Sequence, residues 1–277
     1  MIRPLQIPVA GGTLQATEAG AGPTVLLLHG AAADGRLWAP HQALLADRWR
    51  AVAPTLRYFG TQPWPADGQP RFGVDTHARD LISAIEALGG GPVHLVAWSY
   101  AGHVALTAAA RRPERVASVF AYEPGVPVYV TDPAELGVWQ ADAEAMFGPV
   151  IDALEAGDTA AALRALMDAA GQRAGVLESL PPEQRTMLED NARTLRLQMD
   201  QAPPPPLAPA DLAALPMPVQ VVWGGASRPV FRTVSQAVAR AIAHRTHTEV
   251  TGAGHLWPMQ EPAAFTAALR AFLATVS

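Results

Sequence analysis

Short apolar runs without polar alternation constrain the fold of this chain more than any other feature of its sequence. Five such runs cover residues 24–28, 51–53, 93–97, 116–121 and 219–223. Strands that are apolar on both faces are typical of a parallel sheet with helices on both sides. Helical patterns separate the runs, and residues 76–88 and 262–276 each carry one apolar face. The alternation predicts an α/β fold with a doubly wound, mostly parallel sheet, preceded by an antiparallel strand pair over residues 3–18.

The segment 126–215 interrupts this alternation. It contains helical patterns but no strand-like run, and four consecutive prolines at 203–206 favour a stiff extended connector near its end. We interpret it as a helical lid, or cap, inserted into a core domain formed by residues 1–125 and 216–277, because ligands of α/β sheets bind at the carboxyl ends of the strands. Helices that only cover an edge of the sheet are the alternative.

The composition of the 277-residue chain excludes several classes of chemistry. There is no cysteine, so disulfides, cysteine-ligated zinc, iron–sulfur clusters and a cysteine nucleophile are excluded. Neither H-E-x-x-H nor a G-x-G-x-x-G after a strand occurs, so we expect no metal and no nucleotide cofactor. A net charge of −5 without a basic run argues against nucleic acid and membrane partners. With neither a secretory signal nor an apolar run of about 18 residues, we expect a cytoplasmic monomer or homodimer with a small-molecule substrate.

A serine lies where one apolar run meets a helix. The run over 93–97 leads through Ser99 directly into residues 100–110, which are small and apolar all round. Ala97, Ala101 and Gly102 are small, as a strained strand-to-helix turn requires, so the pattern predicts a nucleophile elbow. The helix N-terminus would then face developing negative charge. A serine that only caps the helix fits the same sequence pattern, so the pattern alone leaves open whether Ser99 is a nucleophile or an N-cap.

Two further segments fit a catalytic site at the same edge of the sheet. The strand over 24–28 ends in a small-residue loop that begins with His29, Gly30 and Ala31. The backbone N–H groups of Ala31 and Tyr100 are therefore candidates for an oxyanion hole. His255 lies in a glycine-containing loop after the last strand, and a histidine that follows an elbow serine in chain order suits a general base.

The His29-Gly30 pair, the loop over 56–61, the Ser99 elbow and the Gly252–His255 loop together resemble the α/β-hydrolase family over nearly the whole chain. This resemblance implies an eight-stranded sheet, Ser99 as the nucleophile, His255 as the base and a carboxylate that holds the base. The acid that usually follows the seventh strand is missing from the turn over 224–229. Glu123, after the sixth strand, resembles the acid of a branch that hydrolyses resorcylic lactones, and we assign it this role. A glutamate that is solvated or paired with Arg228 is the alternative.

These features predict a serine hydrolase that cleaves a carboxylic ester or lactone of a small, moderately hydrophobic substrate through an acyl-enzyme. A carbon–carbon bond hydrolase or a cofactor-free perhydrolase would use the same three residues. A small-molecule receptor that keeps the fold without turnover is the alternative of another class. We expect His29, Tyr58, Trp257 and Asn191 to line the substrate pocket, and Trp98 to pack behind the sheet.

Overall fold

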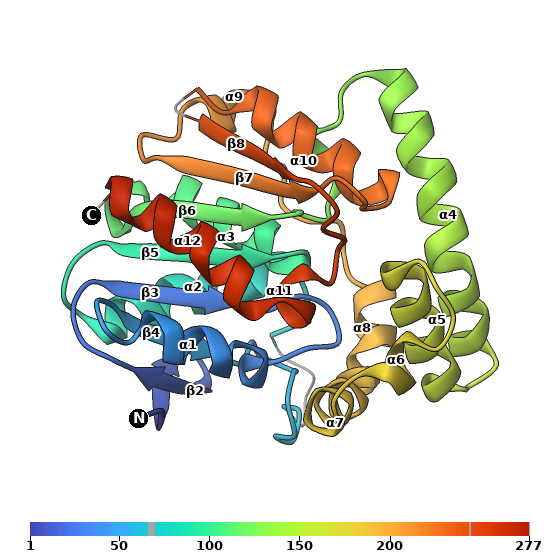
Figure 1. Cartoon of the computed structure of the whole chain (residues 1–277), viewed down its shortest axis with the longest axis horizontal. Coiled ribbons are helices and arrows are strands. Elements are labelled where there is room, and N and C mark those ends of the chain that lie inside the picture. Colours follow the sequence, from blue (N-terminus) through green and yellow to red (C-terminus); the bar gives the residue numbers. More distant parts are fainter. Residues whose placement is uncertain (66–69, 244, 277) are drawn as a thin grey trace.

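The computed structural model describes residues 1–65, 70–243 and 245–276. Its centre is an eight-stranded sheet in the order β1-β2-β4-β3-β5-β6-β7-β8 (Figure 1). Strand β2 is antiparallel to both of its neighbours, and the other strand pairs are parallel. The strands are β1 (Arg3–Val9), β2 (Gly12–Ala19), β3 (Thr24–Leu28), β4 (Arg50–Pro54), β5 (Val93–Trp98), β6 (Val116–Tyr122), β7 (Val219–Gly224) and β8 (Arg245–Val250). The predicted fold class is confirmed, and each of the five apolar runs forms a strand.

Helices cover both faces of the sheet, as its two-sided apolar strands require (Figure 1). Helices α1 (Ala39–Leu45) and α12 (Pro262–Val276) pack on one face. Helices α2 (Val74–Leu88), α3 (Tyr100–Arg111) and α10 (Pro229–Ala241) pack on the other. All six residues of β5 are buried, so the strand that leads to Ser99 lies in the middle of the core. The shorter helical segments of the core are η1 (Gly35–Trp38), η2 (Pro113–Arg115), η3 (Pro127–Tyr129) and α11 (Trp257–Gln260).

The chain between β6 and β7 forms a separate group of helices. It comprises α4 (Pro133–Glu155), α5 (Thr159–Gly171), α6 (Val176–Ser179), α7 (Pro182–Asn191), η4 (Ala192–Thr194) and α8 (Leu195–Met199). The Asp132 and Asp158 side chains cap α4 and α5 by accepting backbone N–H bonds. These helices lie beyond the carboxyl ends of the parallel strands (Figure 1). We call α4 to α8 the inserted helices.

The end of the 126–215 segment does not pack with the inserted helices. The prolines at 203–206 lie outside any helix or strand, as their composition predicts. Helix α9 (Pro209–Ala213) follows them, and its buried Leu212 belongs to the core cluster that contains α3 and α10. Residues 207–215 therefore pack with the core rather than with the inserted helices.

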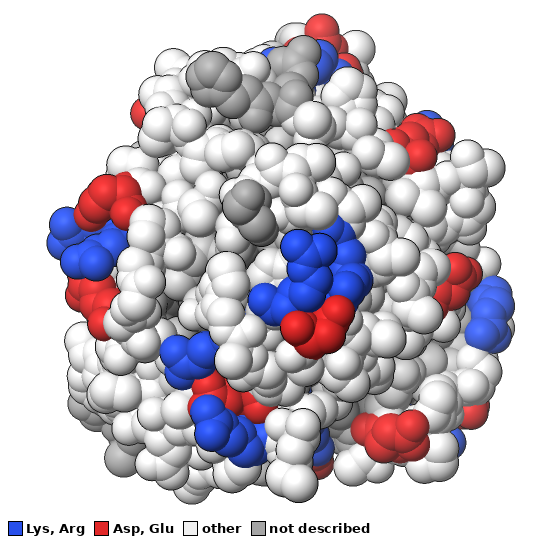
Figure 2. All heavy atoms as spheres, turned by 60° about the vertical axis from the view of Figure 1, so that its left-hand side comes forward, with Lys and Arg blue, Asp and Glu red and all other residues white. Residues whose placement is uncertain are grey.

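The charged side chains of the surface are spread thinly. On the face shown in Figure 2, acidic and basic groups lie in small mixed clusters separated by uncharged surface. Within the described ranges, no helix has both the length and the apolar character that crossing a bilayer requires.

Candidate active site

Ser99 stands on a strained turn between β5 and α3. Its backbone has φ 57° and ψ −121°, a conformation that non-glycine residues rarely adopt. The turn is packed so tightly that a Cβ on Gly102 would lie 2.7 Å from Cβ of Pro124, and one on Gly30 would lie 3.1 Å from Cβ of Ser99. Although Ser99 occupies the N-cap position of α3, its side chain makes no capping bond. The capping interpretation is therefore wrong, and the hydroxyl is free to face the cavity.

The structure brings the three predicted catalytic side chains into one hydrogen-bonded chain. Oγ of Ser99 lies 3.0 Å from Nε2 of His255, and Nδ1 of His255 lies 2.6 Å from Oε2 of Glu123. A carboxylate only accepts, so Nδ1 carries the proton and Nε2 is left to accept the serine proton.

Glu123 is fully buried at the end of β6. Its second oxygen, Oε1, accepts the backbone N–H of Gly224 at 2.7 Å. Arg228, the alternative partner, instead pairs with Asp142 of α4 at 2.7 Å. Both carboxylate oxygens of Glu123 are thus used to orient the histidine and to anchor the acid itself.

Three aromatic side chains hold the loop that carries His255, a role that the sequence did not reveal. The indole N–H of Trp98 donates to the backbone O of His255 at 3.0 Å, and the hydroxyl of Tyr122 donates to the backbone O of Gly254 at 2.7 Å. The ring of Phe231 stacks on the imidazole, with centroids 3.5 Å apart and planes 2° apart. The prediction that Trp98 packs behind the sheet is wrong, because Trp98 lines the cavity. Phe231 lies in an ordinary amphipathic helix, so no sequence signal marks it.

Two backbone N–H groups beside Ser99 are placed to bind an oxyanion. Ala31 and Tyr100 both line the cavity that contains the Ser99 side chain. Neither of their N–H groups has a hydrogen-bond acceptor within the described ranges. Tyr100 is the first residue of α3, where an N–H lacks an intrahelical partner. Gly125 lies beside these donors, and a Cβ there would be in van der Waals contact with Oγ of Ser99, 3.8 Å away.

The cavity in front of Ser99 has a volume of about 160 Å³. Core residues form its floor, and the inserted helices form the rest of its wall. The apolar side chains from these helices include Met146, Phe147, Leu166, Met167 and Leu188. Among the described residues that line the cavity there is no Asp, Glu or Arg. No cluster of three or more metal-ligating side chains was found in the part of the chain that the structure describes.

The predicted pocket residues do not line this cavity. The structure buries all four elsewhere, so this prediction is wrong. Nε2 of His29 accepts the N–H of Leu56 at 3.1 Å, which uses the ring to brace the loop after β4. The Tyr58 hydroxyl donates to the backbone O of Pro70 at 2.7 Å. The Trp257 ring packs on Phe265 of α12, at 5.2 Å between centroids.

Asn191, the fourth of these residues, joins the inserted helices to the core. It is fully buried, its Nδ2 donates to Oδ2 of Asp34 at 2.7 Å, and its Oδ1 accepts the N–H of Gly60 at 2.6 Å. Burial alone would raise the pKa of the Asp34 carboxyl, but hydrogen bonds from Arg36 and Asn191 outweigh it and lower that pKa. Asp34 ends the loop that carries Ala31, so this contact links the inserted helices to the candidate oxyanion hole.

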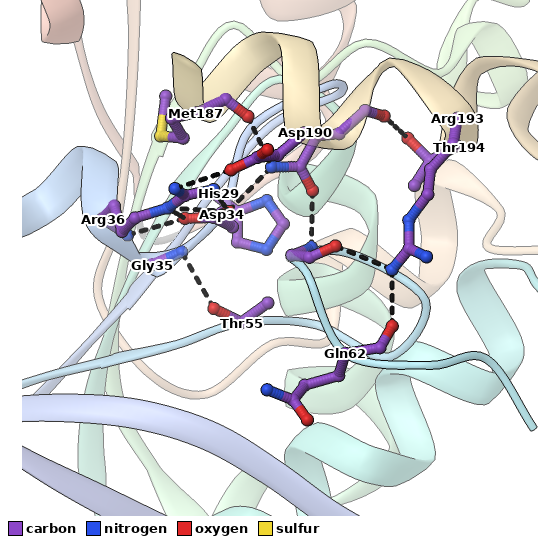
Figure 3. Close-up of polar contacts among 12 residues, drawn as sticks. His29, Asp34, Gly35, Arg36, Thr55, Gln62, Met187, Asp190, Arg193 and Thr194 are labelled. Atoms are coloured by element: carbon purple, nitrogen blue, oxygen red, sulfur yellow. Dashed lines mark hydrogen bonds and ion pairs between the residues drawn. The ribbon is translucent and has the colours of Figure 1, made fainter. Parts of the chain in front are cut away.

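Further polar contacts surround this link (Figure 3). Arg36 pairs with Asp190 at 2.8 Å. Arg193 donates to the backbone O of Gln62 at 2.5 Å and lies over the ring of Trp64, 4.9 Å from its centroid. Asp190, Asn191 and Arg193 thus form a docking contact between the inserted helices and the core.

An elbow serine, a buried glutamate and a loop histidine on a doubly wound sheet define the class of the α/β hydrolases. Residues 25–269 match the model of the alpha/beta hydrolase family. The chain belongs to this family.

The curated relatives and solved structures that the chain resembles include hydrolases of several kinds. The chain is 39% identical to a haloalkane dehalogenase from Mesorhizobium japonicum over 112 residues, which are 40% of this chain and 35% of the relative. It is 29% identical to a pimeloyl-(acyl-carrier protein) methyl ester esterase from Methylococcus capsulatus over 245 residues, 82% of this chain and 86% of the relative. An esterase from Rhodococcus sp. has the same fold, with a TM-score of 0.76 at 22% identity, covering 100% of this chain and 99% of that one. The matches to the dehalogenase and to an epoxide hydrolase from Caballeronia sordidicola span only about a third of each relative, 35% and 36%.

Proposed function

We propose that this protein hydrolyses a neutral carboxylic ester through an acyl-enzyme on Ser99. The observation that carries the proposal is the hydrogen-bonded chain from Ser99 through His255 to Glu123, which opens into an uncharged, mostly apolar cavity. His255 accepts the serine proton as Oγ attacks the carbonyl carbon, and then delivers that proton to the departing alkoxide. Water, deprotonated by the same Nε2, attacks the acyl-enzyme and releases the acid.

The negative charges that develop in this reaction have partners. The N–H groups of Ala31 and Tyr100 supply the two donors for the tetrahedral oxyanion, and losing one such donor typically raises the barrier by about 3 kcal/mol. Glu123 is the counter-ion of the imidazolium that forms while His255 holds the proton. Phe231 stacks on that ring with centroids 3.5 Å apart, which fixes the plane of the imidazole.

The serine at the elbow separates ester hydrolysis from the reactions named for two of the relatives. If Ser99 displaced a halide or opened an epoxide, its Oγ would become an ether oxygen. An ether has no carbonyl for water to attack, so the enzyme would stop after one turnover. An acyl group on the same oxygen leaves a carbonyl, and the cycle can close.

The uncharged cavity separates ester hydrolysis from carbon–carbon cleavage of anionic substrates. A 2-hydroxymuconate semialdehyde hydrolase from Pseudomonas sp. is 32% identical over 114 residues, 40% of this chain. A muconate is a carboxylate, and burying it needs a cationic partner. No Arg lines the described cavity, so a neutral ester or lactone fits better. A cavity of about 160 Å³ holds roughly one benzene-sized group, which favours short acyl chains.

A fluorophosphonate probe tests this function, since it labels only an activated serine. We expect one phosphonylated residue, Ser99, by peptide mass spectrometry, and none in Ser99→Ala. Ser118→Ala is the matched control, because Ser118 also bonds a histidine, His94, at 2.8 Å, but inside the sheet and away from the cavity. A folded wild-type protein that is not labelled would instead support a small-molecule receptor that keeps the fold without turnover.

A substrate screen tests the bond that is cleaved. We expect p-nitrophenyl butyrate and hexanoate to have higher kcat/KM than the dodecanoate, because the longer chain exceeds the cavity. Aliphatic and aromatic lactones in the same screen separate a lactonase from an esterase, and added hydrogen peroxide reveals perhydrolysis of the same acyl-enzyme. Absence of turnover with every ester and lactone would contradict the proposal.

A further inference from the structure

Two glutamines that line the cavity each have a buried side-chain atom without a hydrogen-bond partner among the described residues. Gln198, in α8, and Gln201, just after it, line the same cavity as Ser99. Gln198 is 6% exposed, and its Nε2 is buried without a hydrogen-bond partner among the described residues. The Oε1 of Gln201 is likewise buried and unpartnered there. Native proteins rarely leave buried amide groups in this state, so each atom marks a bond that a ligand can complete.

The two free atoms differ in what they offer. Nε2 of Gln201 donates to the backbone O of Gln198 at 2.9 Å, which holds the second side chain against the end of α8 and leaves its Oε1 as an acceptor. The free Nε2 of Gln198 is a donor. The other described residues that line the cavity from the 126–215 segment are apolar. Gln198 and Gln201, three residues apart, are thus the polar side chains that this segment contributes to the described lining, one with an unpaired donor and one with an unpaired acceptor.

We propose that Gln198 and Gln201 form a subsite for a neutral substrate group that both accepts and donates a hydrogen bond, of which a hydroxyl is the smallest. The proposal rests on ester hydrolysis at Ser99 and narrows its substrate class to hydroxylated esters. A substrate hydroxyl accepts from Nε2 of Gln198 and donates to Oε1 of Gln201. A carboxylate would meet the acceptor oxygen of Gln201 and an ammonium would meet the donor of Gln198, each as a desolvated charge without a counter-ion.

Matched ester pairs test the subsite. The first pair is p-nitrophenyl 3-(hydroxymethyl)benzoate and 3-ethylbenzoate, and the second pair is their 4-substituted isomers. The members of each pair have nearly the same shape, and they differ in the hydroxyl. In at least one pair we expect the wild-type enzyme to favour the hydroxylated ester in kcat/KM by roughly 10- to 100-fold, because the analogue leaves the polar groups of the site unpaired.

Variants of the two glutamines assign that preference. Gln198→Leu and Gln201→Leu should each bring the ratio to about 1 or below, and Gln198→Met serves as a second, unbranched replacement. We expect Gln198→Leu to melt no lower than the wild type, because it removes an unpartnered buried group. Gln201→Leu also loses the bond from Nε2 to the backbone O of Gln198, so its melting temperature is measured beside its kinetics to verify that it is folded. Gln184→Leu is the control that keeps the ratio, since Gln184 bonds the backbone O of Met259 and lies outside the cavity lining.

Two results would overturn the subsite: a wild-type ratio near 1 in both pairs, or a preference that persists in both leucine variants. Failure to hydrolyse any of the four esters is a separate result, which contradicts the proposed function instead. In that case Ser99→Ala is titrated calorimetrically with benzyl alcohol and ethylbenzene. Tighter binding of the alcohol supports the subsite without turnover, and equal or weaker binding refutes it.

Discussion

Replacing Glu123 with glutamine should remove most of the catalysis without removing the fold. Oε1 of Glu123 accepts the N–H of Gly224 at 2.7 Å, and Oε2 accepts Nδ1–H of His255 at 2.6 Å. An amide has one oxygen, and the Gly224 N–H cannot accept a bond. The glutamine oxygen therefore stays on Gly224, and its NH₂ group faces Nδ1. The imidazole proton then lies on Nε2, so Nε2 can no longer accept the proton of Ser99.

The size of the effect follows from the charge that is lost. The centres of the carboxylate and the imidazolium lie about 4 Å apart when their nearest atoms are hydrogen-bonded, and at an effective dielectric constant of about 20 their attraction is about 4 kcal/mol. Losing that attraction in the transition state lowers kcat by about 10³-fold. The wrong tautomer adds to this loss, and we expect a total of about 10³- to 10⁴-fold.

The assay is steady-state hydrolysis of p-nitrophenyl butyrate at pH 8, with circular dichroism to verify folding. Glu249→Gln is the matched control, because Glu249 also accepts one hydrogen bond, from the indole N–H of Trp223 at 2.7 Å, but does not touch His255. We expect that variant to stay within about twofold of the wild type. A folded Glu123→Gln enzyme with more than a tenth of wild-type kcat would refute the role of Glu123.

Three further predictions concern stability, each read from urea denaturation. Gly102→Ala places a Cβ 2.7 Å from Cβ of Pro124, and such overpacking should lower the free energy of unfolding by about 1–3 kcal/mol; an unchanged value would mean that the elbow relaxes freely. Asn191→Leu removes a bond to the buried Asp34 carboxylate and should lower it by about 2–4 kcal/mol, whereas Asp190→Asn, at a part-exposed ion pair, should change it by less than about 1 kcal/mol; equal effects would contradict the docking role. Burial lowers the pKa of five histidines among the described residues, and for three of them the pKa falls to about 4 (His41), about 3 (His77) and about 4 (His103). As the pH falls through 6.5, these histidines take up protons in the unfolded chain but stay neutral in the folded chain. The free energy of unfolding should therefore fall by about 1.4 kcal/mol for each of the three between pH 7.5 and 5.5, and a free energy of unfolding that does not change with pH would refute this.

The fold and the hydrogen-bonded arrangement of Ser99, His255 and Glu123 were predictable because each of their parts leaves a local pattern in the sequence. A strand buried on both faces leaves an apolar run, and the run over 93–97 is β5. The elbow leaves small residues around Ser99, since Gly30 and Gly102 have no room for a side chain. The turn over 224–229 lacks an acid, and Glu123 was assigned because its place after the sixth strand resembles that of the acid in resorcylic-lactone hydrolases.

The pocket was not predictable, because its wall comes from helices whose placement depends on tertiary contacts. His29, Tyr58 and Trp257 are close to catalytic residues in sequence, but each side chain points into a structural contact instead. Most of the actual wall comes from ordinary apolar residues of α4, α5 and α7, which have the pattern of any buried helix face. Sequence proximity to a catalytic residue is thus a poor guide to which side chains meet the substrate.

The position of the acid on β6 has a structural consequence at β7. The turn after β7 contributes a backbone N–H to the Glu123 carboxylate, and Arg228 in that turn binds Asp142 of α4. The same Asp142 accepts the N–H of Val230, next to Phe231. The β7 turn therefore connects the inserted helices to the ring that stacks on His255. Because one short segment anchors the acid, the base and the cavity wall, a change in how α4 docks should affect the orientation of the imidazole as well as the shape of the cavity.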